Sequence, residues 1–305
     1  MIAVKDQIRV RPKSKRRFST LLEGLLYLLP SILLFAVFLF YPMFKTIYLS
    51  LFLTDAQGNT QTFVGLEHYI QLFQSTSFLS SLKATVLFVL YTVPAGVLLA
   101  LGLALLANQK LKGIGFFRTI FSSTMGMSVA ASSVIWLFIY NPTIGIANTI
   151  IKTFGMTEMQ WLLNPDTALL SVALPTIWMN TGFSFLILLG GLHNIDSSLY
   201  ESGKIAGVGD FYSLRKITLP LLSPTLLFIV TVSLINSFQT FGQIDILTKG
   251  GPMESTNVIV YSIFKDAFVN FNIGSASAQA VILFTFILAV TILQFKWGEK
   301  KVHYQ

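Results

Sequence analysis

Six stretches of mainly apolar residues alternate with polar segments along the chain. A helix needs about 20 apolar residues to cross a membrane, because each residue rises about 1.5 Å and the hydrocarbon core is about 30 Å thick. Each stretch is long enough, so the pattern predicts an all-α integral membrane protein with six transmembrane helices. They are expected at residues 24–44, 84–107, 120–140, 168–192, 219–243 and 273–295.

Two of the segments between the expected spans repeat apolar residues at intervals of three and four. Such spacing predicts short helices against the membrane or the bundle, either as an amphipathic cap or in contact with a ligand. The residues concerned are Leu66, Tyr69, Ile70 and Phe73 in the first outer segment, and Ile259, Ile263, Phe264 and Phe268 in the last.

The composition agrees with a membrane protein and leaves no room for a large domain outside the bilayer. Of the 305 residues, 53% are hydrophobic and 11% are charged, and the mean hydropathy is +0.70. In a soluble domain about 25% of the residues are charged. The absence of cysteine excludes disulfides and thiolate chemistry, and the three histidines lie far apart in the sequence. We therefore predict no metal site and no catalytic residue.

The net charge of +8 would suggest nucleic acid as a partner if the protein were soluble. Here the position of the charges indicates orientation in the membrane, and we expect no nucleic-acid partner. Lys and Arg in short loops are retained on the cytoplasmic side, and they concentrate before the first expected span and after the second, fourth and sixth. Both termini are therefore predicted to be cytoplasmic. The Lys and Arg residues on the other side are Lys45, Lys83, Lys152, Lys249 and Lys265.

The six expected spans contain no Asp, Glu, Lys or Arg. Ion-coupled transporters usually keep ionisable residues at mid-membrane, because these groups bind the coupling ion. The absence argues against a secondary transporter, although some carriers bind sodium through neutral oxygens. A stand-alone secondary transporter of a small neutral solute and a membrane scaffold remain the alternatives to be tested.

Neutral polar residues of the fifth span follow one helix face. Their spacing is i, i+3, i+4, i+7, with one more residue a turn earlier. Amides and hydroxyls donate and accept hydrogen bonds without charge, so this face can line a path for a polyhydroxylated solute. It can equally hydrogen-bond to a neighbouring helix. The residues are Ser233, Asn236, Gln239, Thr240 and Gln243.

The fourth span places Trp178 close to Asn180 and Ser184. An aromatic ring beside amides and hydroxyls is a common arrangement for binding sugar, and it is also ordinary for tryptophan near a membrane interface. In the third span, small polar residues recur every four residues, which predicts close packing against a neighbouring helix. These residues are Thr124, Ser128 and Ser132.

The cytoplasmic loop at residues 193–220 contains signals for two short helices. Ser198 and Glu201 have the S-x-x-E spacing of a capping box, which predicts a helix start. Gly207 and Gly209 permit positive φ and are expected to end this helix in a sharp turn. A second helical pattern then leads from Phe211 into the fifth span. The loop is thus predicted to be an exposed helix-turn-helix.

The same loop resembles the E-A-A-x-x-x-G-x(9)-I-x-L-P segment of binding-protein-dependent ABC importer permeases. It reads E-S-G-K-I-A-G at residues 201–207 and I-T-L-P at residues 217–220. Ser202 and Gly203 replace the two alanines of the family, and Gly203 is expected to cost the helix up to about 1 kcal/mol. Residues 246–252, I-L-T-K-G-G-P, are similar to the L-T-x-G-G-P segment of the carbohydrate importers of this family, which include maltose, oligosaccharide and glycerol-phosphate types.

The resemblance implies the type I ABC importer permease (MetI-like) fold in the cell membrane of a prokaryote. It implies that Glu201, Ser202, Gly203 and Gly207 couple the chain to an ATPase, whereas the alternative is a capped surface loop without a partner. The expected partners are a second homologous permease, two ATPase subunits, an extracytoplasmic sugar-binding protein and the lipid bilayer. The sequence has no G-x-x-x-x-G-K-[ST] phosphate loop. We therefore expect a transport subunit that is not an enzyme and binds no cofactor, with ATP and Mg used by the ATPase subunits.

These expectations divide the chain into four parts. Residues 1–23 form a basic cytoplasmic segment, and residues 24–80 form the first span with its outer loop. Residues 81–297 form the permease core, which contains the coupling loop at residues 193–220. Residues 298–305 form a cytoplasmic tail.

Overall fold

The structure is a computed structural model that describes residues 13–109 and 111–298, with side chains from residue 23 onward. Most of the basic segment and of the tail, at residues 1–12 and 299–305, lies outside the described residues. The α-helices are α1 Lys13–Phe35, α2 Tyr41–Leu49, α3 Glu67–Gln74, α4 Thr76–Ala107, α5 Ile114–Ser122, α6 Val129–Ile139, α7 Ile146–Thr153, α8 Pro165–His193, α9 Ser197–Ile205, α10 Asp210–Ser213, α11 Leu219–Phe238, α12 Gly242–Leu247, α13 Ile259–Phe264 and α14 Ile273–Gly298. Short π-helical segments at Ala36–Phe40, Leu214–Thr218 and Lys265–Val269 continue α1, α10 and α13, and a 3₁₀ turn at Ser123–Gly126 follows α5. Strands β1 Phe52–Thr54 and β2 Thr60–Phe63 form an antiparallel hairpin.

Five continuous helices of the described chain are long and apolar enough to cross a membrane. They confirm the first, second, fourth, fifth and sixth expected spans. α4 begins at Thr76 rather than at residue 84, because Ser75 caps it: the Ser75 Oγ accepts a hydrogen bond from the Phe78 N–H at 3.4 Å. The orientation of the spans stays a prediction. The five are Glu23–Leu49, Thr76–Ala107, Pro165–His193, Asp210–Phe238 and Ile273–Gly298.

The third expected span is not one straight helix, contrary to the sequence prediction. α5 and α6 meet at an angle of 107° across the 3₁₀ turn, so that together they make the sixth candidate span. Ser128 starts α6 afresh, since its Oγ accepts a hydrogen bond from the Ala131 N–H at 3.2 Å. A break of this kind inside a membrane protein is tolerated where protein or a water-filled path surrounds it.

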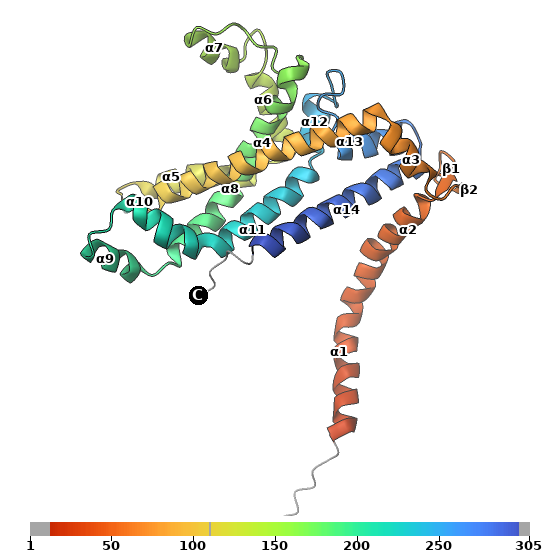
Figure 1. Cartoon of the computed structure of the whole chain (residues 1–305), viewed down its shortest axis with the longest axis horizontal. Coiled ribbons are helices and arrows are strands. Elements are labelled where there is room, and N and C mark those ends of the chain that lie inside the picture. The colour runs from red at the N-terminus through yellow and green to blue at the C-terminus, as the bar shows by residue number, and fades with distance from the viewer. Residues whose placement is uncertain (1–12, 110, 299–305) are drawn as a thin grey trace, which may run out of the picture.

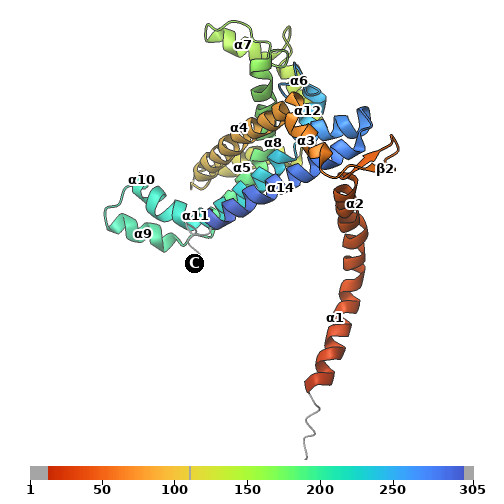
Figure 2. The same cartoon turned by 45° about the vertical axis from the view of Figure 1, so that its right-hand side comes forward.

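The core is built by α4, α8 and α11, which lie side by side in Figures 1 and 2. Ala100 and Ala104 of α4 are completely buried in a cluster that includes Leu188 of α8 and Leu222 of α11. Small residues allow helix backbones to approach closely in a membrane, where the hydrophobic effect does not distinguish a helix from lipid. Gly191 of α8 is such a position, because a Cβ atom there would lie 2.8 Å from Leu222 Cδ1.

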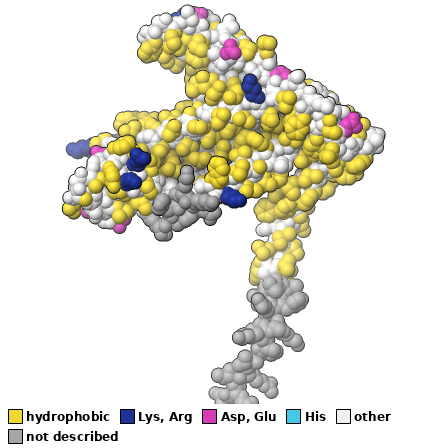
Figure 3. Space-filling model, viewed as in Figure 1, with side chains coloured by type: hydrophobic (Ala, Val, Ile, Leu, Met, Phe, Trp, Pro, Cys, Tyr) yellow, Lys and Arg dark blue, Asp and Glu magenta, His cyan; other side chains and the backbone are white. Residues whose placement is uncertain are grey.

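The first span joins the bundle only at one end. α1 projects away from the other helices in both views (Figures 1 and 2), whereas α2 contacts α14. None of the apolar window of Glu23–Leu49 is buried within the chain. Hydrophobic side chains also cover most of the visible face of the bundle, whereas charged ones gather at its ends (Figure 3). Both surfaces are suited to lipid or to the apolar surface of another membrane protein.

The end of the bundle that carries the hairpin, α3, α12 and α13 is called the platform here. His68 of α3 joins it to the hairpin through a contact of 3.1 Å between His68 Nε2 and the Phe52 carbonyl oxygen. Gly274 at the start of α14 packs so closely that a Cβ atom there would lie 2.6 Å from both of these atoms. α9 and α10 lie at the opposite end of the bundle (Figure 1). The sequence prediction of short amphipathic helices in the first and last outer segments is confirmed by α3 and α13.

Candidate functional site

The loop at residues 193–220 forms the predicted helix-turn-helix, but its start differs from the prediction. α9 begins at Ser197, and its cap is Asp196, whose Oδ1 accepts a hydrogen bond from the Ser198 N–H at 2.9 Å. The capping box of Ser198 and Glu201 is therefore wrong, because an acidic side chain two residues earlier already serves as the cap. These bonds from the backbone and hydroxyl of Ser198 lower the pKa of the Asp196 carboxyl below its usual value.

Gly207 ends α9 as the sequence predicts. Its φ of +73° is left-handed, and its N–H donates to the Lys204 carbonyl at 3.0 Å. The next N–H, of Val208, reaches the Gly203 carbonyl at 2.9 Å, which completes a Schellman motif. Gly209 has a φ of −75° and precedes α10 as its cap, so its expected positive φ is wrong.

Two contacts hold α9 against the start of the fifth span. The Tyr200 hydroxyl and the Thr218 Oγ1 lie 3.0 Å apart, within hydrogen-bond distance. A Cβ atom added at Gly203 would lie 3.5 Å from Ile217 Cδ1, so these two residues are neighbours without crowding. α10, the π-helical segment and α11 form one continuous span, Asp210–Phe238, so α9 contacts the beginning of the same span that contains α11.

The outer surface of this loop combines exposed polar and exposed apolar side chains. Glu201, Ser202 and Gly207 are exposed, whereas Gly203 is half-buried. Ile205 is 89% exposed and Phe211 is 77% exposed. Large exposed apolar side chains beside exposed polar ones, at the end of the bundle, are typical of a docking surface for a protein.

The candidate solute residues of α8 lie near the break in the third span. The rings of Trp178 and of Trp136 in α6 are 6.2 Å apart between centroids, edge to face. Asn180 is half-buried and Ser184 is buried. The side-chain amide of Gln243 in α12 donates to Met179 Sδ at 3.8 Å. The structure thus brings the middle of α8 together with α6 and with the chain that follows α11.

The polar line of the fifth span is interrupted, contrary to the prediction of one continuous helix face. α11 ends at Phe238, Gln239 is its C-cap, and α12 begins at Gly242. The break turns Thr240 and Gln243 into the protein, where both are buried, while Ser233 is half-buried. Asn236 and Gln239 remain exposed, and their side chains make no hydrogen bond among the described residues.

The predicted packing role is correct for Thr124 and Ser132, which are both buried, and wrong for Ser128, which is exposed. The Thr124 Oγ1 accepts a hydrogen bond from the Gly182 N–H of α8 at 3.1 Å. Ser128 instead caps α6, and the buried Ser132 Oγ has no partner among the described residues. Gly126 and the capping serine two residues later are the sequence signals that would have revealed the break.

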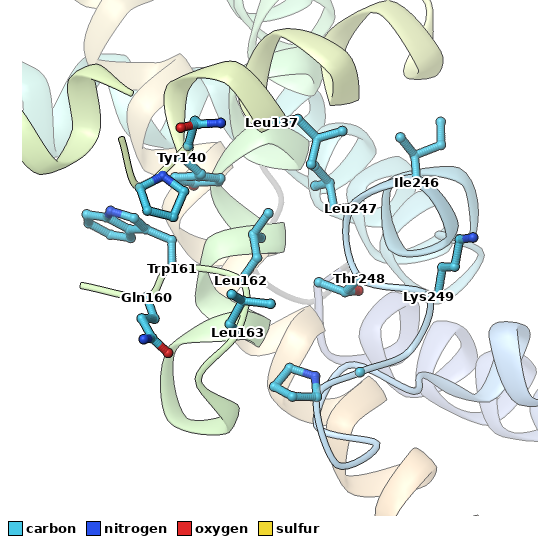
Figure 4. A pocket seen from close by; sticks show the side chains of 14 residues that line it. Leu137, Tyr140, Gln160, Trp161, Leu162, Leu163, Ile246, Leu247, Thr248 and Lys249 are labelled. Carbon is cyan, nitrogen blue, oxygen red and sulfur yellow. The ribbon is translucent and has the colours of Figure 1, made fainter. Parts of the chain in front are cut away.

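A cavity of about 490 Å³ at the platform was not predicted from the sequence. One wall comes from the segment around Tyr140 and Trp161, whose rings stack with centroids 5.4 Å apart. The opposite wall comes from Leu247, Thr248 and Lys249 of the L-T-K-G-G-P segment (Figure 4). The segment that resembles the L-T-x-G-G-P pattern therefore lines a cavity.

Comparison with known proteins identifies the family. Residues 92–303 match the family described as binding-protein-dependent transport system inner membrane component. The sn-glycerol-3-phosphate transport system permease protein UgpA of Agrobacterium fabrum is 37% identical, over 90% of this chain and 94% of that protein. The protein of the same name from Brucella abortus is 36% identical, over 91% of this chain and 94% of its own.

A solved structure shows the same fold. The chain superposes with a TM-score of 0.80 on a chain of the bacterial alginate ABC transporter, crystallised in complex with an alginate pentasaccharide-bound periplasmic protein. The two are 22% identical, and the match covers 95% of this chain and 99% of that one. The alternative of a stand-alone secondary transporter finds no support in these relatives. The protein therefore belongs to the binding-protein-dependent transport system inner membrane components and is a permease subunit of an ABC importer.

Proposed function

We propose that this permease imports a sugar or a related polyhydroxylated compound such as a glycerol phosphate. Its relatives include permeases of sn-glycerol-3-phosphate systems, and the fold is that of a transporter crystallised with an alginate pentasaccharide-bound protein. The complete importer contains a second homologous permease, two ATPase subunits and an extracytoplasmic binding protein. ATP and Mg²⁺ are used by the ATPase subunits and not by this chain.

The observation that carries the proposal is the exposed α9 braced on the fifth span. An ATPase subunit binds the surface formed by Glu201, Ser202 and the neighbouring apolar residues Ile205 and Phe211. Closure of the ATPases displaces α9, and the contact between Tyr200 and Thr218 transmits this displacement to α11. The movement of α11 then changes the transporter between its inward-open and outward-open conformations.

Asn236 and Gln239 are the residues of α11 that meet the solute. An amide that faces lipid without a hydrogen-bond partner is costly, so the exposed face of these residues requires water, a solute or a second permease against it. α8 contributes Trp178, Asn180 and Ser184 from the neighbouring helix. The fifth span adds the hydroxyl groups of Ser233 and Thr240. Neutral amides suit hydroxyl groups because they both donate and accept hydrogen bonds.

The coupling role is tested by Glu201→Lys in the assembled importer. We expect the ATPase to dissociate during purification and uptake of radiolabelled solute to fall to background, because a positive charge replaces a negative one at the docking surface. Glu158→Lys is the matched control, since Glu158 is exposed at the opposite end of the molecule and pairs with Lys152 at 2.5 Å. Retention of the ATPase by the Glu201 variant would remove α9 as the docking element.

The solute path is tested separately by Asn236→Leu combined with Gln239→Leu. This variant should keep the ATPase but lose most of its uptake, with Thr285→Leu on the exposed side of α14 as the control. Normal uptake by the double variant would exclude these two amides from the path.

A further inference from the structure

A second, smaller cavity of about 210 Å³ lies at the platform, between α3, the start of α4, α13 and the start of α14. It differs from the larger cavity of Figure 4 because most of its lining is polar. The polar side chains that carry the following argument are His68, Ser77, Ser262, Asp266, Ser275 and Gln279.

Asp266 brings a negative charge to this cavity. Its Oδ2 accepts hydrogen bonds from Ser275 Oγ at 3.0 Å and from Gln279 Nε2 at 2.5 Å, and its Oδ1 accepts one from Asn270 Nδ2 at 2.9 Å. All three donors are neutral. The adjacent Lys265 instead pairs with Glu254 at 3.6 Å. Within the described part of the chain, the charge of Asp266 therefore has no cationic partner.

Gln279 adds a buried acceptor without a donor. Only 1% of this residue is exposed, and its Nε2 is committed to Asp266. Its Oε1 is buried and has no hydrogen-bond partner among the described residues. Buried amide oxygens nearly always accept a hydrogen bond, because an unpaired oxygen has lost its hydrogen bonds to water and has no protein hydrogen bond to replace them.

Two hydroxyl groups of the cavity have already donated their protons. The Ser77 hydroxyl donates to Glu254 Oε2 at 2.8 Å, and the Ser275 hydroxyl donates to Asp266. A hydroxyl has one proton, so both can offer an occupant only lone pairs. His68 is 4% exposed and its Nε2 lies 3.1 Å from the Phe52 carbonyl. Since a carbonyl can only accept, His68 Nε2 donates in this contact and its proton is not available to an occupant of the cavity.

We propose that this cavity binds one monovalent metal cation of the sodium or potassium type. A single carboxylate without a cationic partner, the Gln279 oxygen and several hydroxyl oxygens together form a set of hard acceptors with one net negative charge. Calcium sites use six to eight oxygens with several carboxylates, and magnesium demands near-octahedral geometry, whereas sodium is bound in some carriers largely by neutral oxygens. The bound ion would tie the start of α4 to α14. This proposal does not depend on the transported solute.

The test is the thermal unfolding of the full chain in detergent, with its co-purifying subunits, followed by tryptophan fluorescence. Protein in choline chloride is titrated with NaCl, and separately with KCl, at constant total ionic strength. We expect a saturable rise of about 5 °C in Tm with at least one of the two ions.

Asp266→Asn should abolish this rise, because it removes the charge while keeping the size of the side chain. Asp55→Asn is the matched control: Asp55 is an exposed carboxylate in the hairpin of the same platform, it accepts hydrogen bonds from Asn59, and it does not line the cavity. If the Asp266 variant does not fold, Ser262→Ala decides, with an expected rise of about fivefold in the half-saturating ion concentration.

Four results would overturn the proposal. A Tm that follows only ionic strength means that the cavity holds water alone. A sodium or potassium effect that survives in the Asp266 variant, or an unchanged half-saturating concentration in the Ser262 variant, places the ion elsewhere. A rise at micromolar CaCl₂ that exceeds the effect of both monovalent ions would assign the site to a divalent cation.

Discussion

α8 and the first span are both long apolar helices, yet they take opposite places in the molecule. In α8, 56% of the most apolar window is buried inside the chain, whereas in the first span the share is 0%, although the first span is the more hydrophobic of the two. High hydrophobicity therefore predicts that a helix lies in the membrane, but it does not predict that the helix is buried in the core of the protein. In a bilayer, contact between helices depends on small residues and on hydrogen bonds. α8 has Gly182 and Gly191 at its contacts, whereas nothing lies within 4 Å of a Cβ atom added at Gly24, the one glycine of the first span.

The largest expected effect compares the two helices directly. Leu188→Ala should lower the free energy of unfolding by about 2–5 kcal/mol, because Leu188 is completely buried and its removal leaves a cavity. Leu33→Ala in the first span, where Leu33 is 55% exposed, should change it by less than about 0.5 kcal/mol. Denaturant unfolding of the purified chain in detergent measures both. Similar losses for the two variants would mean that the first span folds onto the bundle.

The next prediction concerns the glycines of α8. Gly182→Ala should destabilise the chain by about 1–3 kcal/mol, because its Cβ would lie 2.5 Å from Thr124 Oγ1 and 2.8 Å from the Met125 nitrogen. Gly190→Ala, where nothing lies within 4 Å of the new atom, should stabilise the helix by up to about 1 kcal/mol. Thermal unfolding should therefore shift in opposite directions. A gain of stability in both variants would show that the bent third span does not pack on α8.

A smaller effect is expected at the contact between α9 and the fifth span. Tyr200→Phe removes a hydrogen bond and should cost about 1 kcal/mol. In the assembled importer, it should lower the amount of solute moved per ATP hydrolysed, because α9 is then less firmly joined to α11. Tyr212→Phe is the control, since Tyr212 is 55% exposed and makes no hydrogen bond among the described residues. Unchanged coupling in the Tyr200 variant would show that other contacts transmit the movement.

The smallest effect is expected within α9. Gly203→Ala restores an alanine of the family pattern and should stabilise α9 by a few tenths to about 1 kcal/mol, because the new methyl group meets Ile217 at an ordinary contact distance. Gly207→Ala should instead cost about 1 kcal/mol, because its φ is +73°. Hydrogen exchange of the amides of α9 would detect both changes. Faster exchange in the Gly203 variant would contradict the packing described here.

The sequence predicted well those elements that depend on length, composition or local spacing. The positions of five spans, the amphipathic α3 and α13, and the turn at Gly207 follow from hydropathy, periodicity and the conformational freedom of glycine. It also identified the family, because two short motifs placed in a definite topology are rarely accidental. The roles of Glu201 and of the proposed solute residues stay predictions.

The wrong predictions share one cause: two neighbouring sequence signals compete, and hydropathy and spacing do not show which of them determines the structure. Asp196 displaced Ser198 as the cap of α9, and Ser128 started a new helix inside an apolar stretch that hydropathy counts as one. The end of α11 at Phe238 separated Asn236 from Gln243. Neither cavity of the platform was predictable, because each is lined by segments far apart in the chain, such as Ser77 and Gln279.

The π-helical segment Leu214–Thr218 has a consequence for the evolution of this transporter. A π-helical turn has i→i+5 hydrogen bonds and so holds one residue more than an α-helical turn, whereas each residue of an α-helix accounts for about 100° of rotation. Loss of one residue at Leu214–Thr218 would therefore restore an α-helical turn and leave the orientation of α11 nearly unchanged. The same loss in the regular part of α11 before Asn236 would turn Asn236 and Gln239 by about a quarter of a turn relative to α10. The π-helical segment is thus the place where this span can gain or lose one residue without changing which side chains of α11 face the neighbouring helices.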